Sequence, residues 1–597
     1  MTIKFPQTPG AFKQLGDTDV LGNIWSSFNL DLTSNVGRMR VGQRGIIVSK
    51  STDGGLTLMT TPVAFRMFAT NATNHRIWAI AGKMVYNAGR PNDPFVVDSS
   101  GGVPTVGDGS DMELFNDALY VVGTSEISKF DGSNWSVIGS GLGTPNTTTC
   151  VYAGRFYYAK NSASISSLDL ADANSNPSGT PNTIPYTLNL SNFGTGGAAA
   201  NTITAIRATS NRIWITTVDK TSQNYSAGRA GKVFEWDGVS TQANKVYYLD
   251  SIGALSMVIK GDTPYIMDAD GKLLAFNGST FAKVAELPTA PNQYLRNPTN
   301  TITDAFIHPR GMTVRNERIM ILINNQVDDL TGSIIENLPS GVWEYDTDMG
   351  LYHKYSVSHW KNDGITTMTD YAQNRVVEVG ALFSAKSTSD NVNGDLLFGA
   401  KYYQTTTDLI SGIFINDTND TIAKVGYFVT TKIDSQNIED VWQKCYAIYK
   451  RFLTSTDKII IKYRTVEDIP TEVDVTWTSQ TTFTTTGDIS SYVIGDEVEI
   501  TAATGSGQCA HITNIVLTSG TYTVALDDTI TGVYGVSKAR FQKWRKAGTI
   551  TGQYVQQDQV PIEQTSPWVQ LKVVMYFTGP NELNYLQIIN KSDVKPV

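Results

Sequence analysis

The 597-residue sequence has few cysteines, little charge and no recognisable targeting segment. Its three cysteines, Cys150, Cys445 and Cys509, are odd in number and far apart, and no CxxC pair occurs. Nothing therefore indicates a disulfide framework or a cysteine metal site, and we expect three buried thiols and folding in a reducing cytoplasm. The first residues lack the apolar segment of a signal peptide, and no run of about eighteen apolar residues predicts a membrane span.

Positive charge is scarce. The chain has 47 Lys and Arg against 56 Asp and Glu, which gives a net charge of −9, and only 17% of its residues are charged. This argues against a sequence-specific nucleic-acid binder, which carries a strongly basic face. The 51 glycines and abundant Thr, Ser and Asn suit turns and sheet surfaces, and 41% hydrophobic residues provide a packed core. The composition predicts a large, all-β globular protein.

A short unit recurs along the first two thirds of the chain. It is a turn with Asn, Asp or Gly followed by three or four β-formers, often aromatic, as in Asn74–Ile80 and Asn211–Thr216. Sequence periods of about 20 to 50 residues indicate repeat architectures. The strands of this unit begin at residues 77, 119, 156, 213, 265, 319 and 376.

A second element follows most of these units: a strand that ends in an aromatic residue and an Asp or Asn. The sequence Asp-Gly or Asn-Gly predicts a two-residue hairpin turn, and the aromatic can pack between sheets. Four strands per unit predict an irregular β-propeller of six to eight blades, with a meandering β-sandwich array as the alternative. The four occurrences are Phe130-Asp131-Gly132, Trp236-Asp237-Gly238, Phe276-Asn277-Gly278 and Tyr345-Asp346-Thr347.

The patterning divides the chain into three parts. Residues 1–60 form an N-terminal segment whose strands close or flank the propeller, which spans 61–404. Residues 405–597 form a C-terminal β-sandwich with a small β-barrel inserted at about 492–540, where short strands follow one another closely. Residues 438–453 fit a strand or a short amphipathic helix.

Four motifs raise the question of chemistry, and none predicts a catalytic residue. Ser51-Thr-Asp53-Gly-Gly55-Leu-Thr57 resembles the Asp box of sialidase-like propellers, with Leu58 in place of the usual Trp. In those propellers the turn is structural. Asp268-Ala-Asp270-Gly271 and Asp346-Thr-Asp348-Met-Gly350 offer two acids each, without the further ligands of a calcium loop. Gly228-Arg-Ala-Gly231-Lys232-Val233 has the wrong glycine spacing for a phosphate loop.

Histidines and basic residues provide the remaining candidates. The five histidines form no metal or protease motif, and we expect packing or surface roles for them. Basic residues cluster twice, and each cluster fits either a solvated strand face or a contact with an acidic subunit or phosphates. We therefore predict no metal, cofactor or catalytic site, and no enzyme. The residues concerned are His75, His308, His353, His359 and His511, and the clusters Arg38, Arg40 and Arg44 and Arg540, Lys543, Arg545 and Lys546.

The stretch Ser26–Arg44, the degenerate repeats and the C-terminal β region together resemble a tailed-phage virion protein. The most similar type is the tail nozzle (tail tubular protein B-like) propeller protein of short-tailed phages. The likeness lies in architecture and not in a motif, so it assigns no functional residues.

The resemblance implies a homo-oligomeric ring, typically of six subunits, made in the host cytoplasm and located in the virion tail. Its implied partners are other copies of itself, the portal and adaptor, other tail proteins and tail fibres. Double-stranded DNA would pass through the lumen without specific binding during genome ejection. An acidic wall suits this role because it repels phosphates, whereas a basic wall would bind them.

Two other functions remain open on the sequence. One is a receptor- or glycan-binding tail spike, in which aromatic and polar propeller loops would stack on sugars. The other is a sialidase-like glycan-cleaving enzyme, which would need paired carboxylates at the propeller centre.

Overall fold

The computed structural model describes a large part of the chain, and every regular element in that part is a β-strand. The protein is therefore all-β. The described residues are 2–4, 24–28, 30–31, 39–41, 45–50, 61–69, 75–82, 84–91, 93–98, 109–123, 126–140, 148–161, 164–168, 188–190, 202–218, 231–287, 307–324, 326–328, 334–336, 340–347, 350–357, 376–385, 395–403, 409–416, 424–430, 432–434, 441–449, 457–466, 470–502, 508–530, 535–551, 557–577 and 582–591.

Among these residues, seven antiparallel sheets of four strands each occupy the first two thirds of the chain. The first three are β6 (Pro62–Ala69), β7 (His75–Ala81), β8 (Met84–Ala88) and β9 (Val96–Val97); β10 (Gly109–Phe115), β11 (Ala118–Gly123), β12 (Glu126–Phe130) and β13 (Trp135–Ser140); and β14 (Thr149–Tyr152), β15 (Arg155–Asn161), β16 (Ser164–Leu168) and β17 (Leu188–Asn189).

The next three sheets follow in chain order, and a separate hairpin projects from the last of them. They are β18 (Thr202–Ala208), β19 (Ile213–Val218), β20 (Lys232–Trp236) and β21 (Lys245–Tyr248); β22 (Ala254–Lys260), β23 (Thr263–Asp268), β24 (Lys272–Phe276) and β25 (Phe281–Glu286); and β26 (Met312–Arg315), β27 (Arg318–Ile323), β30 (Gly341–Asp346) and β31 (Gly350–Ser356), with the hairpin β28 (Gln326–Asp328) and β29 (Ile334–Glu336).

The seventh sheet joins both ends of this region. It pairs β32 (Val376–Ala385), β33 (Asp395–Tyr403) and β34 (Leu409–Asn416) with β5 (Gly45–Lys50) from the N-terminal segment. The strand β34, which the sequence analysis assigned to the C-terminal domain, thus belongs to this sheet. The fourth strand of the last sheet therefore comes from the N-terminal segment. It covers the edge of β34 that would otherwise be free.

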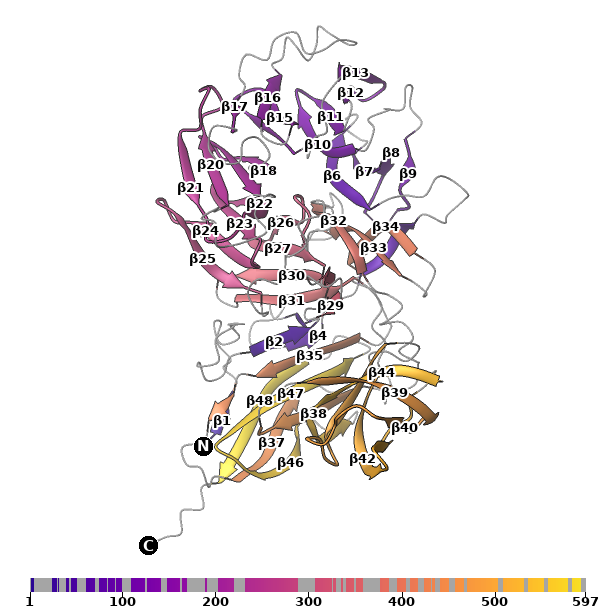
Figure 1. Cartoon of the computed structure of the whole chain (residues 1–597). Coiled ribbons are helices and arrows are strands. Elements are labelled where there is room, and N and C mark those ends of the chain that lie inside the picture. Colours follow the sequence, from indigo (N-terminus) through magenta and orange to yellow (C-terminus); the bar gives the residue numbers. More distant parts are fainter. Residues whose placement is uncertain are drawn as a thin grey trace.

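The sheets form a closed ring through their first strands. β6, β10, β14, β18, β22, β26 and β32 each contact the next in this order, and β32 returns to contact β6. Figure 1 shows the sheets arranged around a common axis. This is the β-propeller arrangement, in which each sheet buries its faces against its two neighbours.

The seam between the last and first sheets is unusually tight. A side chain at Gly380 would place its Cβ 1.9 Å from the carbonyl oxygen of Pro62, and one at Gly399 would place it 2.4 Å from the same atom. Both positions therefore require glycine, because backbone rather than a movable side chain occupies the space.

The recurring aromatic residues pack between successive sheets. An aromatic ring on the second strand of one sheet contacts an aromatic at the end of the third strand of the next, with ring centroids 4.8 to 6.4 Å apart. The aromatic residues that recur in the sequence are therefore the residues that form contacts between successive sheets. The pairs are Trp78 with Phe130, Tyr157 with Trp236, Trp214 with Phe276, and Tyr265 with Tyr345.

The Asp-Gly and Asn-Gly turns differ from the predicted two-residue hairpins. After β12, Asp131 Oδ1 accepts the backbone N–H groups two and three residues further on, each at 2.8 Å. Asn277 does the same after β24, at 3.0 and 2.9 Å, and Asp237 after β20, at 2.9 and 2.8 Å. The side-chain oxygen supports a longer loop, so the prediction of two-residue turns is wrong.

Two six-stranded sheets form the C-terminal sandwich. One contains β3 (Leu30–Asp31), β4 (Met39–Val41), β48 (Glu582–Lys591), β37 (Val441–Tyr449) and β46 (Gln557–Thr565), with β1 (Thr2–Lys4) also on β48. The other contains β2 (Ile24–Phe28), β35 (Lys424–Thr430), β47 (Trp568–Phe577), β38 (Lys458–Arg464) and β45 (Arg545–Thr551), with β36 (Ile433–Asp434) also on β47.

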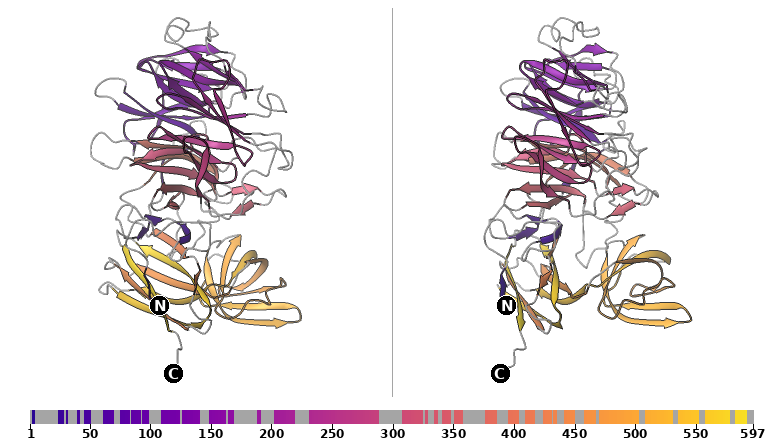
Figure 2. Two further views of the ribbon diagram at one scale, coloured as in Figure 1. Left: turned by 90° about the vertical axis from the view of Figure 1, so that its left-hand side faces the viewer. Right: turned by 60° about the vertical axis from the view of Figure 1, so that its left-hand side comes forward.

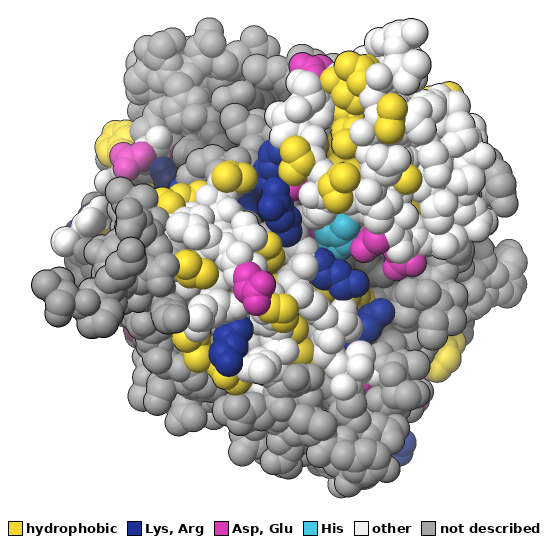
Figure 3. Space-filling model, turned by 90° about the horizontal axis from the view of Figure 1, so that it is seen from below, with side chains coloured by type: hydrophobic (Ala, Val, Ile, Leu, Met, Phe, Trp, Pro, Cys, Tyr) yellow, Lys and Arg dark blue, Asp and Glu magenta, His cyan; other side chains and the backbone are white. Residues whose placement is uncertain are grey.

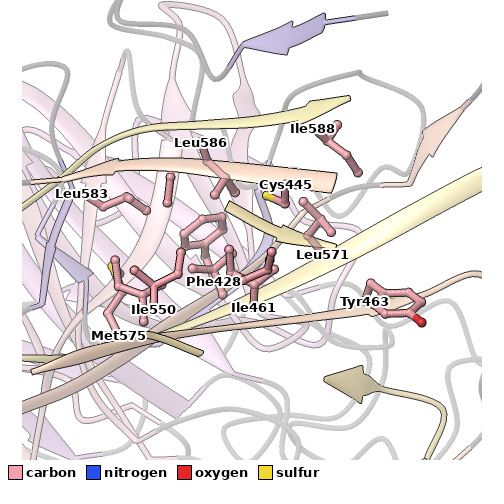
Figure 4. Packing of buried hydrophobic residues seen from close by; sticks show 14 of the residues in the cluster. Phe428, Cys445, Ile461, Tyr463, Ile550, Leu571, Met575, Leu583, Leu586 and Ile588 are labelled. Atoms are coloured by element: carbon pink, nitrogen blue, oxygen red, sulfur yellow. The ribbon is translucent and has the colours of Figure 1, made fainter. Parts of the chain in front are cut away.

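The sandwich core lies between these sheets. Figure 4 shows Leu583, Leu586 and Ile588 of β48 facing Phe428 and Ile461 of the opposite sheet. β37 occupies residues 441–449 of the segment 438–453, for which a helix was the alternative, so the described part of that segment is a strand. The N-terminal residues divide between the two bodies, because β1 to β4 join the sandwich and only β5 joins the propeller.

A closed six-stranded barrel is inserted between β38 and β45. It begins at Thr471, well before the predicted start near residue 492, because its first two strands precede the segment recognised in the sequence. Figure 2 shows the barrel beside the sandwich. Its strands, in spatial order, are β39 (Thr471–Ser479), β40 (Thr482–Thr485), β43 (Thr521–Leu526), β42 (Cys509–Thr518), β41 (Glu497–Ala502) and β44 (Gly535–Gln542).

The propeller meets the sandwich through β31. Because β2 and β3 lie against it, this outer strand is buried along most of its length, whereas the residues of the outer strands β21 and β25 are intermediate or exposed. Tyr352 of β31 belongs to the same hydrophobic cluster as Leu30 and Trp442 of the sandwich. The two bodies therefore share part of one core.

We expect Trp214→Ala to destabilise the propeller by about 3–5 kcal/mol, because the indole fills the space between two sheets and contacts Tyr247, Phe276 and Phe281. Denaturant unfolding monitored by fluorescence measures this change. The control is Tyr248→Ala in β21 of the same sheet, since Tyr248 is 66% exposed and its loss should change stability little. Equal effects of the two substitutions would contradict the packing role of Trp214.

Candidate functional site: the propeller axis and the sandwich–barrel junction

A short segment before β26, Ile307–Gly311, lies at the centre of the ring. The carbonyl oxygen of Pro309 accepts hydrogen bonds from Arg207 Nη2 of β18 at 3.2 Å and from Ser256 Oγ of β22 at 3.0 Å. The carbonyl of Arg310 accepts the backbone N–H of Leu382 in β32 at 2.8 Å. The segment is thus tied to three of the innermost strands through its backbone.

The side chain of Arg310 reaches the inner strands on the other side of the axis. Its Nε and Nη2 donate to the two carboxylate oxygens of Asp111 in β10 at 2.8 and 2.5 Å, a bidentate ion pair. Nη2 also donates to the carbonyl of Thr149 in β14 at 3.1 Å. Asp111 is fully buried and accepts the backbone N–H of Thr149 at 2.8 Å, so its oxygens are well satisfied.

A second ion pair lies beside the first. Arg66 of β6 donates from Nε and Nη2 to Glu113 of β10 at 3.0 and 2.6 Å, and Arg310 Nη2 lies 3.6 Å from the same carboxylate. Burial alone would raise the pKa of both carboxyl groups, but Arg310 lowers that of Asp111 and Arg66 lowers that of Glu113, and the net direction is down. Both acids are therefore ionised at neutral pH and neither can serve as a general acid.

Arg207 and His308 complete this axial cluster, which comprises Arg66, Asp111, Glu113, Arg207, His308 and Arg310. Burial and the nearby Arg310 lower the pKa of Arg207 to about 9, and burial lowers that of His308 to about 4. His308 is neutral at pH 7, and its Nδ1 accepts the backbone N–H of Arg310 at 3.1 Å. The contacts of the cluster are directed to one another and to the backbone, so its chemistry is that of a structural network.

A separate polar cluster joins the sandwich to the barrel. Glu497 of β41 is fully buried and forms ion pairs with Lys462 of β38 and, at 3.4 Å, with Lys572 of β47. Burial would raise the pKa of Glu497, but the two lysines lower it well below the ordinary range. His511 Nε2 lies 3.8 Å from Glu497, and its Nδ1 lies 3.4 Å from Asp527 Oδ2. This cluster fixes the barrel against the sandwich.

The second basic cluster of the sequence lies beside this junction and is largely neutralised. Lys543 and Arg545 pair with the buried Asp496 at 3.0 and 3.5 Å, and Arg540 lies 3.5 Å from Glu472. Figure 3 views the molecule from this end, and basic and acidic side chains lie interspersed around a histidine on the described surface. These cations serve internal pairs, as on an ordinary solvated strand face.

The first calcium candidate is a strand-end turn. Asp268 Oδ1 accepts the backbone N–H groups of Asp270 and Lys272 at 3.0 and 2.8 Å, and Lys272 pairs with Asp270 at 3.4 Å. In the part of the chain that the structure describes, no group of three or more His, Cys, Asp or Glu could hold a metal ion. Asp346 of the second candidate instead pairs with Arg318 at 2.7 Å.

Several sequence candidates lie partly or wholly outside the described residues. These are the Asp-box segment 51–58, residues 228–230 of the phosphate-loop segment, Asp348, Arg38, Arg44 and His359. Among the others, Arg40 lies opposite Asp31 in the register of β4 and β3, and His75 is the first residue of β7. His353 is buried and neutral, with its pKa lowered to about 3 by burial and its Nε2 3.0 Å from the carbonyl of Ser340.

The cysteines are free in the structure. Cys150 and Cys445 are buried, and Cys509 is intermediate in exposure. Burial raises the pKa of all three thiols, so none is activated as a nucleophile at neutral pH. Across the described segments, no helix has the length and apolar character needed to cross a membrane.

Sequence reasoning missed the axial cluster. Two of its members occur as single charged residues in apolar strands: Arg66 in Ala64–Phe68 and Arg207 after Ile206. A lone charge in an otherwise buried strand was the only available signal, because the partner lies up to 199 residues away in the sequence.

We expect Arg310→Met to destabilise the propeller by about 3–5 kcal/mol, because Asp111 would remain buried without its cation. Denaturant unfolding measures the change. The double variant Asp111→Asn, Arg310→Met should recover much of the loss, since it removes the unpaired charge. A double variant no more stable than the single one would contradict this account.

Asp268 provides a pH-dependent prediction. Burial and the neighbouring Asp270 raise its pKa to about 7, so the folded chain retains a proton that the unfolded chain loses near pH 4. Stability from this residue is present at low pH and is lost as pH rises to about 7. Asp268→Asn keeps an acceptor for both N–H groups. It should therefore be more stable than the wild type by roughly 2–4 kcal/mol at pH 8 and nearly equal at pH 4. Thermal unfolding across pH tests this, and a pH-independent difference would contradict it.

Comparisons with known proteins assign no family. No protein-family model matches the chain, and no curated protein matches it significantly. Solved structures with partial likeness include the computationally designed Ika8 protein (10% identity, 63% of this chain and 99% of that one, TM-score 0.33). BBS1N in complex with ARL6DN (10%, 64% and 99%, 0.35) and BamB from Moraxella catarrhalis (12%, 61% and 84%, 0.30) are similar to a comparable extent. At these TM-scores the likenesses carry no argument about function.

Proposed function

We propose that this protein is a structural subunit of a phage tail, of the nozzle type, which assembles into a ring around the path of the ejected genome. It acts without cofactor or catalysis and resides in the virion tail after synthesis in the host cytoplasm. Its partners are further copies of itself, the portal and adaptor, other tail proteins and tail fibres. Double-stranded DNA passes through the ring without specific contacts.

The observation that carries this proposal is the filled propeller axis. A propeller encloses a central channel, and here Ile307–Gly311 and the axial cluster occupy it. Arg310 is only 11% exposed and Asp111 is fully buried. Bidentate ion pairs and backbone hydrogen bonds connect the inner strands across the axis, and they hold these strands in a fixed arrangement. Such a construction suits a wall element better than a receptacle for a ligand.

Rigid coupling between the bodies supports the same role. The chain crosses between sandwich and propeller twice, once between β4 and β5 and once between β34 and β35. The buried strand β31 and the shared hydrophobic cluster around Tyr352 join them further. A subunit that must keep its shape during DNA ejection benefits from such a joint.

The finer architecture belongs to this proposal. We take the seven four-stranded sheets as the blades of one propeller, within the predicted range of six to eight, with β5 as the outer strand of the last blade. The sandwich with its inserted barrel is then a second body attached below the propeller.

The genome path in this proposal lies between subunits and not through a propeller. Its wall must not bind phosphates, and the net charge of −9 meets that condition. The basic residues near the barrel contribute little attraction because Asp496 and Glu472 neutralise them.

Electron microscopy tests the proposal in two steps. The purified chain at increasing concentration should form closed rings with one central opening, and virions that contain the chain should carry it as a ring on the particle axis. Antibody labelling of a C-terminal tag identifies the ring. Copies on peripheral projections would instead support the receptor- or glycan-binding spike, and would contradict the nozzle.

A matched binding measurement completes the test. The ring should bind duplex DNA weakly at low salt and not measurably at physiological salt, because each subunit carries a net charge of −9. Tight, salt-resistant binding would contradict a passive channel wall.

A further inference from the structure

The hairpin β42–β43 of the barrel has a free edge. β42 pairs with β41 only from Cys509 to His511, and a last contact joins Ile512 to the backbone at Gly495 and Asp496. Beyond that point β42 continues to Thr518 with β43 on one side. In the described part of the chain no strand pairs with its other side.

The outer half of this hairpin carries no charge and exposes two large apolar side chains. From Ile512 to Leu526 the sequence contains no Asp, Glu, Lys, Arg or His. Val516 is 46% exposed and Leu517 is 58% exposed, and their successive positions direct them to opposite faces of the strand. Both faces of the hairpin therefore present apolar surface to water.

Such an edge is unusual for a protein that acts alone. A free strand presents unpaired N–H and C=O groups that can pair with another chain, and monomeric proteins protect it with charges, proline or a covering loop. Between Asn514 and Thr518 there is neither charge nor proline. The turn at Ser519 and Gly520, with φ of 51° and 80°, suits a tight hairpin and holds the edge in a defined conformation.

We propose that a second copy of this chain docks on the free edge of β42, with Val516 and Leu517 at the centre of the contact. Charge favours this occupant. Each copy carries −9, so two copies approach most easily through surfaces that carry no charge, and this hairpin is such a surface. The proposal deepens the ring function above, on which it rests for the presence of several copies.

In a ring, the hairpin would form one of the two surfaces that meet at each contact between copies. A cyclic ring requires that each copy present two different surfaces, so the hairpin of one copy meets another region of the next. The hairpin lies on the barrel, an insertion with its own hydrophobic core of buried residues such as Phe483 and Phe541. Changes at the exposed tip should therefore leave that core intact.

Two charged double variants test the contact, Val516→Asp with Leu517→Asp and Val516→Lys with Leu517→Lys. Sedimentation velocity over a concentration series measures self-association of the full chain. Both variants should weaken it at least about a hundredfold, because either charge would be buried without a partner. Because one variant adds negative and the other positive charge, a loss of self-association in both shows that burial of charge is the cause, and not repulsion between acidic copies.

The matched control is Val536→Asp. Val536 is 68% exposed at the start of β44, where its partner is Thr476, and β41 separates β44 from β42 in the barrel. It should self-associate as the wild type does. Circular dichroism and thermal unfolding should be equal for all four proteins, because each substituted side chain is exposed.

Two results would overturn the proposal: a wild type that stays monomeric at every concentration, or charged variants that associate like the wild type. Microscopy of the same samples separates this from the ring function. If rings persist in both charged variants, the proposed nozzle function is retained and the proposed hairpin contact is contradicted. Hairpin-dependent association into dimers without rings keeps the contact and contradicts the nozzle.

Discussion

The bidentate pair between Arg310 and Asp111 determines how the centre of this propeller is built. A carboxylate buried at the axis would be costly without a cation, and Arg310 provides it from a segment that also binds three other inner strands through its backbone. Strands from distant parts of the chain thus converge on one short segment, Ile307–Gly311. The axis becomes a braced core, and any opening for a long polymer has to lie elsewhere.

Closure of the ring depends on a second constraint, at the seam between first and last sheets. Gly380 and Gly399 leave room for the backbone at Pro62, and β5 supplies the missing outer strand. Because β1 to β4 belong to the sandwich, the same N-terminal segment that completes the propeller also anchors the second body. Closure and coupling therefore follow from one path of the chain.

Local patterns in the sequence predicted the sheets but not their long-range partners. The aromatic unit was visible because strand and ring lie within a few residues, and six of the seven unit starts fall on second strands, such as Ile77 on β7. The seventh, at Val376, falls on a first strand, since β33 occupies the second position there. The axial cluster and the start of the barrel at Thr471 escaped detection, because both depend on pairing across long sequence separations.

Charge links these features to assembly. Many described cations are used inside the subunit: Arg66 and Arg310 at the axis, Lys462 and Lys572 at the barrel junction. The acidic surplus is then left unbalanced, and copies of the chain repel one another at long range. Association against that repulsion needs short-range apolar and backbone contacts, and these form most easily on surfaces that carry no charge. In the proposed assembly a charge-free hairpin on an acidic protein meets this need, because it offers a site where two copies can come into contact without repulsion between like charges.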